Sequence, residues 1–365
     1  MELQRVIENI YILEGHLAQS QANEHILLAN ESGRQETVAV LHSLLKSLYP
    51  GSNIETLPIT LINYRDVLEK KIQSSTNVVV INLCDGVESD GYPGIGVVNF
   101  LEERNVAFTG ADAIFYENTT SKPVLKKLLE QENVPTAKFI EIRRGAESID
   151  LDLAISQLGF PFIVKPAISY GSLGITDESV VESKDAALKQ VQLLQKVSEA
   201  FVEVFLPGRE YTVLVTGDAH QGVKVYPAME RNFSDSLKGN QRILSFERSW
   251  EGFDLGSIPA ADASHIYWHE LAPSDIQEKL KEISKLAYLS CGGSGYGRVD
   301  IRTKSRDHCE PVVLEVNANC GLSFIPHSSS LADILFNSQT DPKEFCKDLI
   351  NFAIRRQAIL DNQRG

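Results

Sequence analysis

Two short segments near the end of the chain, residues 297–301 and 313–317, alternate apolar and polar side chains along their length. A period of two residues is typical of a β-strand that buries one face. The polar stretch between them, residues 304–310, is short enough for a hairpin connection. The sequence therefore predicts a pair of neighbouring strands with one polar face and one buried face.

The polar side chains of this pair are of the kinds that hold a divalent cation beside a phosphate. Residues two apart in a strand share a face, so Arg298 and Asp300 point the same way, as do Glu315 and Asn317. Mg²⁺ takes oxygen ligands and usually shares them with substrate phosphates. Each segment alone fits an ordinary strand with a solvated outer face. The two together are better explained by a metal–phosphate site.

Length, charge and cysteine content limit the class of protein. A chain of 365 residues exceeds one typical domain, so we expect two or three lobes. A formal net charge of −14 argues against a nucleic-acid partner and against an anionic membrane surface. No signal peptide or membrane span is evident, and the five cysteines form no C-x-x-C pair. These features predict a soluble, cytoplasmic protein with reduced thiols.

The first part of the chain alternates strand-like and helix-like segments. Residues 24–30 have the composition of a buried strand, and residues 36–49 have helical spacing that stops at a Pro-Gly pair. Residues 77–83 form an apolar run typical of a central parallel strand. A helix at 95–104 and a short strand at 106–108 follow. This alternation predicts a doubly wound α/β lobe.

We place the limits of that lobe at residues 1–120 and expect two further lobes, at 121–206 and 207–365. The fold class is α/β, passing to α+β in the later lobes. The second lobe is predicted to begin with a helix at Ser121, and the third to be richer in strands. The remaining predicted strands are 137–142, 161–165 and 200–204, and the predicted helices are 149–158, 184–197, 274–290 and 342–360.

Lys165 ends an apolar strand and precedes a glycine-containing loop, residues 168–174. Glycines let the backbone approach a phosphate closely and turn its amides toward the oxygens. Lys165 would supply a charge and Ser172 a hydroxyl donor, and the loop is a candidate lid. Many hairpins share this pattern, and no Walker-type P-loop is present.

Residues 200–213 consist of a strand, a Pro-Gly turn and a second strand, with acids at Glu203 and Glu210. Such a connection offers backbone groups to an adenine edge and a carboxylate to ribose hydroxyls. Taken in isolation, the segment is better explained as a plain connector with two exposed acids.

The order of these features resembles the ATP-grasp superfamily, and most closely its D-alanine–D-alanine ligase branch. The resemblance covers residues 77–335. It is carried by a helix-borne lysine, a strand-borne lysine with its glycine loop, an acidic hinge and the two metal-site strands. These motifs are Thr120-Ser121-Lys122, residues 158–166, 207–213 and 295–300, and residues 314–321.

The resemblance implies an ATP-grasp fold, in which an N-terminal doubly wound lobe precedes two lobes that clamp ATP. It implies that Lys122 and Lys165 contact the phosphates. Residues 203–206 would bind adenine and Glu210 the ribose. The nucleotide and metal residues that it implies are Lys122, Lys165, Glu203, Val204, Phe205, Leu206 and Glu210 for ATP, and Asp300, Glu315 and Asn317 for Mg²⁺ or Mn²⁺.

The same resemblance implies that Arg298, the Gly321 amide and Ser172 act in catalysis. Ser323, His327 and Arg231 are the candidates on the substrate side. The implied reaction moves the γ-phosphoryl group of ATP onto an acid, and an amino acid amine then displaces phosphate from the acyl phosphate. A homodimer is expected, because dimers are common among the resembled ligases.

The acceptor half of the pattern departs from those ligases. The loop after Asn317 reads Ala-Asn-Cys-Gly in place of Ser-Pro-Gly, and residues 30–37 poorly match the loop that holds the first D-alanine. A related amino-acid ligase is therefore at least as well supported as a cell-wall dipeptide ligase. One alternative is the branch that joins an amino acid to a cyclohexenone as an imine, in mycosporine-like amino acid synthesis. Another is a catalytically silent nucleotide-binding regulatory module.

Three further features stay secondary. Residues 226–250 form a basic segment, with Arg231 among its cations, and fit either a substrate flap or a solvated one. His265 and His269 are four apart, as on a helix face, but lack a third ligand, so we interpret them as surface or packing residues. Nothing in the sequence indicates that Cys320 is a nucleophile.

Overall fold

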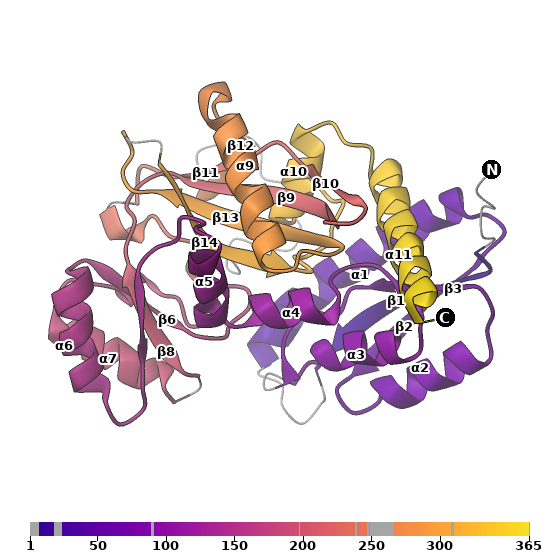
Figure 1. Cartoon of the computed structure of the whole chain (residues 1–365), viewed down its shortest axis with the longest axis horizontal. Helices are drawn as coiled ribbons and strands as arrows, with labels where there is room; N and C mark the ends of the chain where they lie inside the picture. The colour runs from indigo at the N-terminus through magenta and orange to yellow at the C-terminus, as the bar shows by residue number, and fades with distance from the viewer. Residues whose placement is uncertain are drawn as a thin grey trace.

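The computed structural model describes residues 7–17, 24–88, 91–196, 198–237, 239–246, 248, 266–307 and 310–364, with only the backbone for 24–34 and 364. Three β-sheets succeed one another along the chain, and Figure 1 shows them in three neighbouring lobes. Each sheet lies within one of the three predicted lobes, whose limits stay a prediction.

The first sheet has four parallel strands in the order β2-β1-β3-β4. The predicted central strand, the helix after it and the short strand before residue 109 are all present. The elements are β1 (Asn9–His16), α1 (Glu24–Leu48), β2 (Asn53–Thr60), α2 (Tyr64–Gln73), β3 (Val78–Asn82), α3 (Ile95–Glu103) and β4 (Ala107–Phe108).

The strand predicted at residues 24–30 is wrong. Those residues begin helix α1, which continues through the predicted helix at 36–49, and the first strand is β1 instead. Short apolar runs do not distinguish a strand from a helix by periodicity alone. β1 pairs with β2 on one side and β3 on the other, so it occupies the buried interior position.

The second sheet is antiparallel, in the order β5-β8-β6-β7. Phe162, Val164 and Val202 point to one face, where two helices cover them. Lys165 and Glu203, on alternate positions of the same strands, therefore share the opposite face. The elements are β5 (Phe139–Ile142), α6 (Glu147–Leu158), β6 (Phe162–Pro166), β7 (Val180–Val181), α7 (Lys184–Leu194) and β8 (Ala200–Val204).

The third sheet is antiparallel, in the order β12-β11-β9-β13-β14, with β10 also paired to β9. The predicted hairpin is confirmed: Arg298 lies opposite Asn317, and Asp300 lies opposite Glu315. The elements are β9 (Glu210–Asp218), β10 (Gly222–Val225), β11 (Met229–Phe233), β12 (Tyr267–Leu271), α9 (Ser274–Ser290), β13 (Tyr296–Thr303), β14 (Pro311–Ala318) and α10 (Ser330–Asn337).

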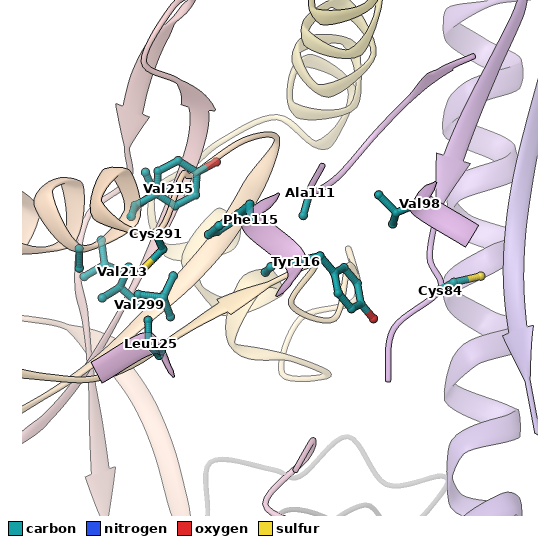
Figure 2. Packing of buried hydrophobic residues seen from close by; sticks show 14 of the residues in the cluster. Cys84, Val98, Ala111, Phe115, Tyr116, Leu125, Val213, Val215, Cys291 and Val299 are labelled. Carbon is teal, nitrogen blue, oxygen red and sulfur yellow. The ribbon is translucent and has the colours of Figure 1, made fainter. Parts of the chain in front are cut away.

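One face of the third sheet belongs to a core that also reaches the first lobe. Val213 and Val299 pack there with residues of α9 and of α4 (Ala113–Thr120). Figure 2 shows that the neighbouring residues Phe115 and Tyr116 of α4 point to opposite sides. Phe115 points toward the valines of the third sheet, and Tyr116 points toward Cys84 in the first lobe. The first and third lobes therefore share one apolar core.

Two helices pack outside the lobe to which their sequence position assigns them. Leu125 and Leu129 of α5 (Lys122–Gln131) join the core of the third sheet. Cys346 and Ile350 of α11 (Pro342–Arg364) pack on the first sheet. In Figure 1 the C-terminal helix α11 accordingly runs beside the strands of the first lobe. Among the residues described here, no helix is both long and apolar enough to span a membrane.

Arg356 of α11 ties the first and third lobes together. Its buried guanidinium donates to the carbonyls of Phe108 (2.7 Å) and Gly110 (2.8 Å) and to Ser294 Oγ (2.9 Å). Arg356→Met would leave these buried acceptors without a donor, which costs about 3 kcal/mol in the free energy of unfolding. Denaturant unfolding of the purified variant measures this loss.

Arg355→Met is the matched control, because Arg355 is the exposed neighbour on the same helix. It should unfold like the unsubstituted protein. Equal stabilities for the two variants would show that the buried contacts of Arg356 contribute nothing.

Candidate active site

The face of the third sheet opposite the core carries charged side chains. Arg298, Asp300 and Arg302 alternate along β13 and so point the same way, and Glu315 and Asn317 of β14 lie opposite the first two. We call this side of the sheet the polar face. The same alternation that buries Val299 and Ile301 therefore brings the predicted metal ligands together.

Asp300 is held from two sides on the polar face. Arg298 donates through Nε to Oδ1 (2.9 Å) and through Nη2 to Oδ2 (2.7 Å), and Asn317 Nδ2 donates to Oδ2 (3.0 Å). Glu315 pairs with Lys122 Nζ, 3.0 Å from Oε2. Burial alone would raise the pKa of Glu315, but Lys122 and Lys165 outweigh it and lower the pKa to about 2.

These residues fit a magnesium ion that shares its ligands with a phosphate chain. Two carboxylates and an amide side chain lie together, with lysine and arginine beside them. Within the described part of the chain, no group of three or more His, Cys, Asp or Glu residues forms a candidate metal site. An incomplete oxygen set of this kind suits Mg²⁺, which keeps water and phosphate ligands, better than a metal held by protein alone.

Glu203 lies between two lysines on the face of the second sheet opposite its covering helices. Lys126 Nζ is 2.7 Å from Glu203 Oε2, and Lys165 pairs with Oε1. The side chains of Glu203 and Lys126 are each only 1% exposed. Burial alone would raise the pKa of Glu203, but the two lysines outweigh it and hold the pKa below its usual value. Lys126 also donates to Thr136 Oγ1 (3.0 Å).

The hinge, residues 203–206, has most of its backbone groups engaged. Val204 N donates to Lys138 O (3.0 Å), and Phe205 N donates to Pro161 O (3.3 Å). The carbonyl of Leu206 accepts from Arg302 Nη1 (3.0 Å), and this guanidinium also lies over the Phe205 ring. Within the described residues, the Leu206 amide makes no backbone hydrogen bond, so it is the hinge donor left for a ligand.

Glu210 begins β9, beyond the hinge, and is buried between two arginines. Arg231 Nη1 donates to Oε1, and Arg302 Nε lies 3.1 Å from Oε2. Arg231, predicted on the substrate side, is thus committed to Glu210 and to Ser330 Oγ (3.3 Å). A carboxylate has about four lone-pair positions, so Glu210 keeps acceptor capacity for hydroxyl donors.

We call residues 319–329, which follow β14, the acceptor loop. Asn319 adopts a left-handed conformation (φ 51°) and accepts from Ala111 N (2.8 Å), which fixes the loop to the first lobe. A Cβ on Gly110 would lie 2.3 Å from the Asn319 oxygen, so this approach requires glycine. Gly321 is exposed, and among the described residues its amide makes no backbone hydrogen bond.

The other predicted substrate residues of this loop have local partners. The buried Ser323 Oγ lies 2.7 Å from Ser328 Oγ and accepts from Ile325 N (3.2 Å). His327, with φ 66°, is largely exposed and has Nδ1 3.3 Å from an oxygen of Asp333. Within the described part of the chain, neither side chain is hydrogen-bonded or ion-paired with Asp300, Glu315 or Asn317, so their role on the substrate side stays a prediction.

The glycine-containing loop after β6 is anchored at the start of α5. Lys122 N donates to Ala167 O (2.9 Å), and Lys122 Nζ donates to Ser169 O (3.3 Å). Ser172 has a left-handed backbone (φ 62°), between glycines that also have positive φ. That geometry suits amides that face an anion, and the closure of this loop as a lid stays a prediction.

Two arginines of the predicted basic flap are paired, Arg242 with a carboxylate of the flap and Arg248 with a carboxylate of the second lobe. Arg242 pairs with Asp235 (3.0 Å), and Arg248 pairs with Asp177 (2.5 Å). The rest of the prediction for residues 226–250 lies partly outside the described residues, which omit 238, 247, 249 and 250. His265 lies outside them as well.

Four residues near the site were missed by sequence reasoning: Lys126, Arg302, His269 and Asp333. Two had readable signals, since Lys126 is one helical turn after Lys122, and Arg302 is two residues after Asp300. His269 lies on strand β12, so the helix-face spacing considered for it was wrong, although its side chain is only 4% exposed, in agreement with a packing role. Cys320 is buried, and burial raises the pKa of its thiol to about 12, which keeps it protonated.

Comparison with known proteins places this geometry in a class. The family model described as "D-ala D-ala ligase C-terminus" matches residues 128–351, more than half of the chain. The fold and the site define an ATP-grasp ligase, an enzyme class that forms carbon–nitrogen bonds. The chain belongs to the D-Ala–D-Ala ligase family, whose members use ATP and Mg²⁺.

Three similar proteins illustrate the relation. An uncharacterized protein of Sinorhizobium fredii is 29% identical over 252 residues, which is 68% of this chain and 67% of the relative. A D-alanine–D-alanine ligase of Actinobacillus pleuropneumoniae is 28% identical over 306 residues, 82% and 88% of the two chains. The solved D-alanine–D-alanine ligase of Bacillus anthracis, complexed with ATP, superposes with a TM-score of 0.69 at 18% identity and covers 98% of this chain and 99% of its own.

Lys126 should contribute strongly to the free energy of unfolding of the protein. Lys126→Met removes one of the two cations that compensate the buried Glu203, and breaking such a pair costs about 3 kcal/mol in the free energy of unfolding. Because the pKa of Glu203 lies below 4.5, its contribution is complete above pH 4.5 and is lost as the pH falls through the folded-state pKa. The deficit of the variant should therefore shrink in acid, as denaturant unfolding between pH 7 and pH 3 would measure.

Lys127→Met supplies the control for this substitution. Lys127 is 55% exposed and pairs at the surface with Glu141, so its loss should cost less than about 1 kcal/mol. A deficit in Lys126→Met that does not depend on pH would contradict the assigned pairing.

Proposed function

We propose that this protein is an ATP-dependent ligase that joins the amine of an amino acid to an acid activated by phosphorylation. The observation that carries the proposal is the convergence of Lys122, Arg298, Asp300 and Glu315 at one place on the polar face. Cations that bind phosphates and oxygens that bind Mg²⁺ lie within direct contact of each other. Family membership supports the same reaction class.

The residues have the following proposed roles in nucleotide binding. Lys122 and Lys165 bind the phosphate chain of ATP, the Leu206 amide donates to the adenine edge, and Glu210 accepts from the ribose hydroxyls. Asp300, Glu315 and Asn317 would hold the magnesium ions. Bound there, Mg²⁺ would neutralise charge on the β- and γ-phosphates.

Phosphoryl transfer breaks the bond between the γ-phosphorus and ADP and forms a bond to an oxygen of the acid. Arg298 lies beside the metal ligands and stabilises the charge of the transferred group. The amine then attacks the acyl carbon, loses a proton, and phosphate leaves. The Gly321 amide donates to the oxyanion of that step, an interaction worth about 3 kcal/mol. Ser172 and its glycine neighbours exclude water from the acyl phosphate.

The acceptor is the open part of the proposal. The acceptor loop is held by Asn319 and by a Ser323–Ser328 contact. Its sequence differs from the Ser-Pro-Gly of the D-alanine ligases. An amino-acid ligase with another acceptor therefore stands beside a dipeptide ligase, and the imine-forming branch that uses a cyclohexenone stays a prediction. Free cysteines among the described residues are compatible with the reducing cytoplasm. A homodimer also stays a prediction.

Phosphate release from Mg·ATP tests the function. The purified protein is incubated with single amino acids, with pairs of them, and with amino acids plus a cyclohexenone acceptor. We expect stimulated release with at least one combination, with ADP and phosphate formed in equal amounts. Tight ATP binding with no stimulation by any combination would instead identify a regulatory nucleotide-binding module.

Glu315→Gln should lower the maximal rate about 100-fold or more, because it removes one anionic ligand from a site where the metal contributes several kcal/mol. The amide has the same shape, so the fold should persist. Steady-state kinetics across a Mg²⁺ titration measures the loss. Glu310→Gln, an exposed position on the same hairpin, should behave like the unsubstituted protein. A near-normal rate in Glu315→Gln would refute the metal assignment.

A further inference from the structure

A row of four polar side chains crosses the polar face at right angles to the strands. His269 of β12 lies opposite Arg231 of β11, Arg231 lies opposite Glu210 of β9, and Glu210 lies opposite Arg302 of β13. Each of four neighbouring strands therefore contributes one residue. We call these residues the cross-sheet row.

The members of the cross-sheet row contact one another in order. Arg231 Nε donates to His269 Nε2 (3.3 Å), and Arg231 Nη1 donates to Glu210. Glu210 pairs in turn with Arg302, which reaches the hinge through the carbonyl of Leu206. None of the four side chains is more than 8% exposed. One end of the row thus lies at the predicted adenine hinge.

The other end of the row reaches the acceptor loop through Asp333, in the first turn of α10. Its Oδ2 lies 2.7 Å from His269 Nδ1, and its Oδ1 accepts from the backbone N of His327 (3.0 Å). His327 belongs to the loop that carries Gly321, and α10 begins directly after that loop. A continuous set of buried contacts therefore runs from the hinge to the acceptor loop.

The partners of His269 fix its protonation. A guanidinium only donates and a carboxylate only accepts, so Nε2 must accept from Arg231 and Nδ1–H must donate to Asp333. Burial lowers the pKa of His269, and the nearby charge of Arg231 lowers it further. The hydrogen bond to Asp333 acts in the opposite direction and does not outweigh them. The imidazole is thus neutral, and it bridges the Arg231 guanidinium and the Asp333 carboxylate.

Charge balance makes the row stiff. Together with Asp333, the row contains two arginines and two carboxylates, and the neutral imidazole lies between Arg231 and Asp333. All of these groups are buried. A buried ion that loses its partner costs several kcal/mol. If Glu210 shifts to accept ribose hydroxyls, Arg231 must follow it, and His269 and Asp333 must follow Arg231. Independent movement of one member is the costly alternative.

We propose that His269 and Asp333 are positioning residues that couple ribose binding at Glu210 to the conformation of the acceptor loop. Neither side chain needs to touch a substrate for this role. The inference rests on the proposed function, because it takes Glu210 as the ribose ligand. It adds a reason why a nucleotide-site carboxylate should be bonded to an arginine that also holds a histidine.

Hydrogen exchange with a non-hydrolysable ATP analogue and Mg²⁺ tests the coupling without any acceptor. In the unsubstituted protein, amides of residues 327–337 should exchange at least about fivefold more slowly when the analogue is bound, in line with typical couplings between sites. His269→Phe fills the same space without either hydrogen bond. It should bind the analogue within about threefold of the unsubstituted protein and should lose the slowing.

Two further variants make the result specific. His269→Asn keeps a donor for Asp333 but offers no acceptor placed for Arg231, so it should also lose the slowing, and it decides the question if His269→Phe does not fold. Trp268→Phe changes the neighbouring, half-buried residue of β12 and should keep the slowing.

The outcomes separate the two hypotheses. Calorimetry that detects no binding of the analogue to the unsubstituted protein would overturn the proposed function, and the coupling with it. Binding without slower exchange at 327–337, or slowing that persists in a folded His269 variant, would overturn the coupling alone.

Discussion

The two-faced third sheet is the constraint on which the rest of the molecule depends. Its core face buries Val299 and Val316 in the apolar core shared with the first lobe, and strand alternation then forces Asp300 and Glu315 to the opposite side. A register slip of one residue would exchange the faces, burying charges and exposing valines. The apolar core therefore specifies the positions of the proposed metal ligands, although it lies on the far side of the sheet from them.

The charged groups of the site already compensate one another. Lys122 pairs with Glu315, Arg298 pairs with Asp300, and Lys165 pairs with Glu203. A triphosphate alone would draw the cations away and leave carboxylates bare, and a metal ion alone would do the reverse. In the proposed complex the phosphates take Lys122 and Lys165, Mg²⁺ takes Asp300 and Glu315, and Glu203 keeps Lys126 as its partner, so no buried carboxylate is left unpaired. The proposed site is in this sense built for the metal–nucleotide complex as a unit.

The sequence was sufficient wherever the signal is local. Alternation revealed the hairpin that carries Asp300 and Glu315, and helical spacing revealed the helices that flank the sheets. It failed at residues 24–30, where a short apolar run fits either period, and at His269, whose partners come from other elements. The cross-sheet row depends on the mutual register of strands separated by long stretches of chain, and Arg356 meets acceptors roughly 250 positions earlier. No local pattern encodes such partners, so these contacts become visible only in the folded structure.

The apolar cores determine which lobes can move relative to one another at the proposed site. The first and third lobes share one core through Phe115 and Tyr116. The second lobe has a separate core around Phe162 and Val164. Two smaller clusters, one joining Ile163 to Ile243 and one joining Ala137 to Val312, connect the second lobe to the third. A rotation of the second lobe would therefore disturb fewer apolar contacts than a separation of the first and third lobes. Asn319 fixes the acceptor loop to the first lobe, so the loop would stay in place if Lys165 of the second sheet moved relative to the proposed phosphate site. Under the proposed function, acceptor choice and nucleotide entry would therefore depend on different contacts between the lobes.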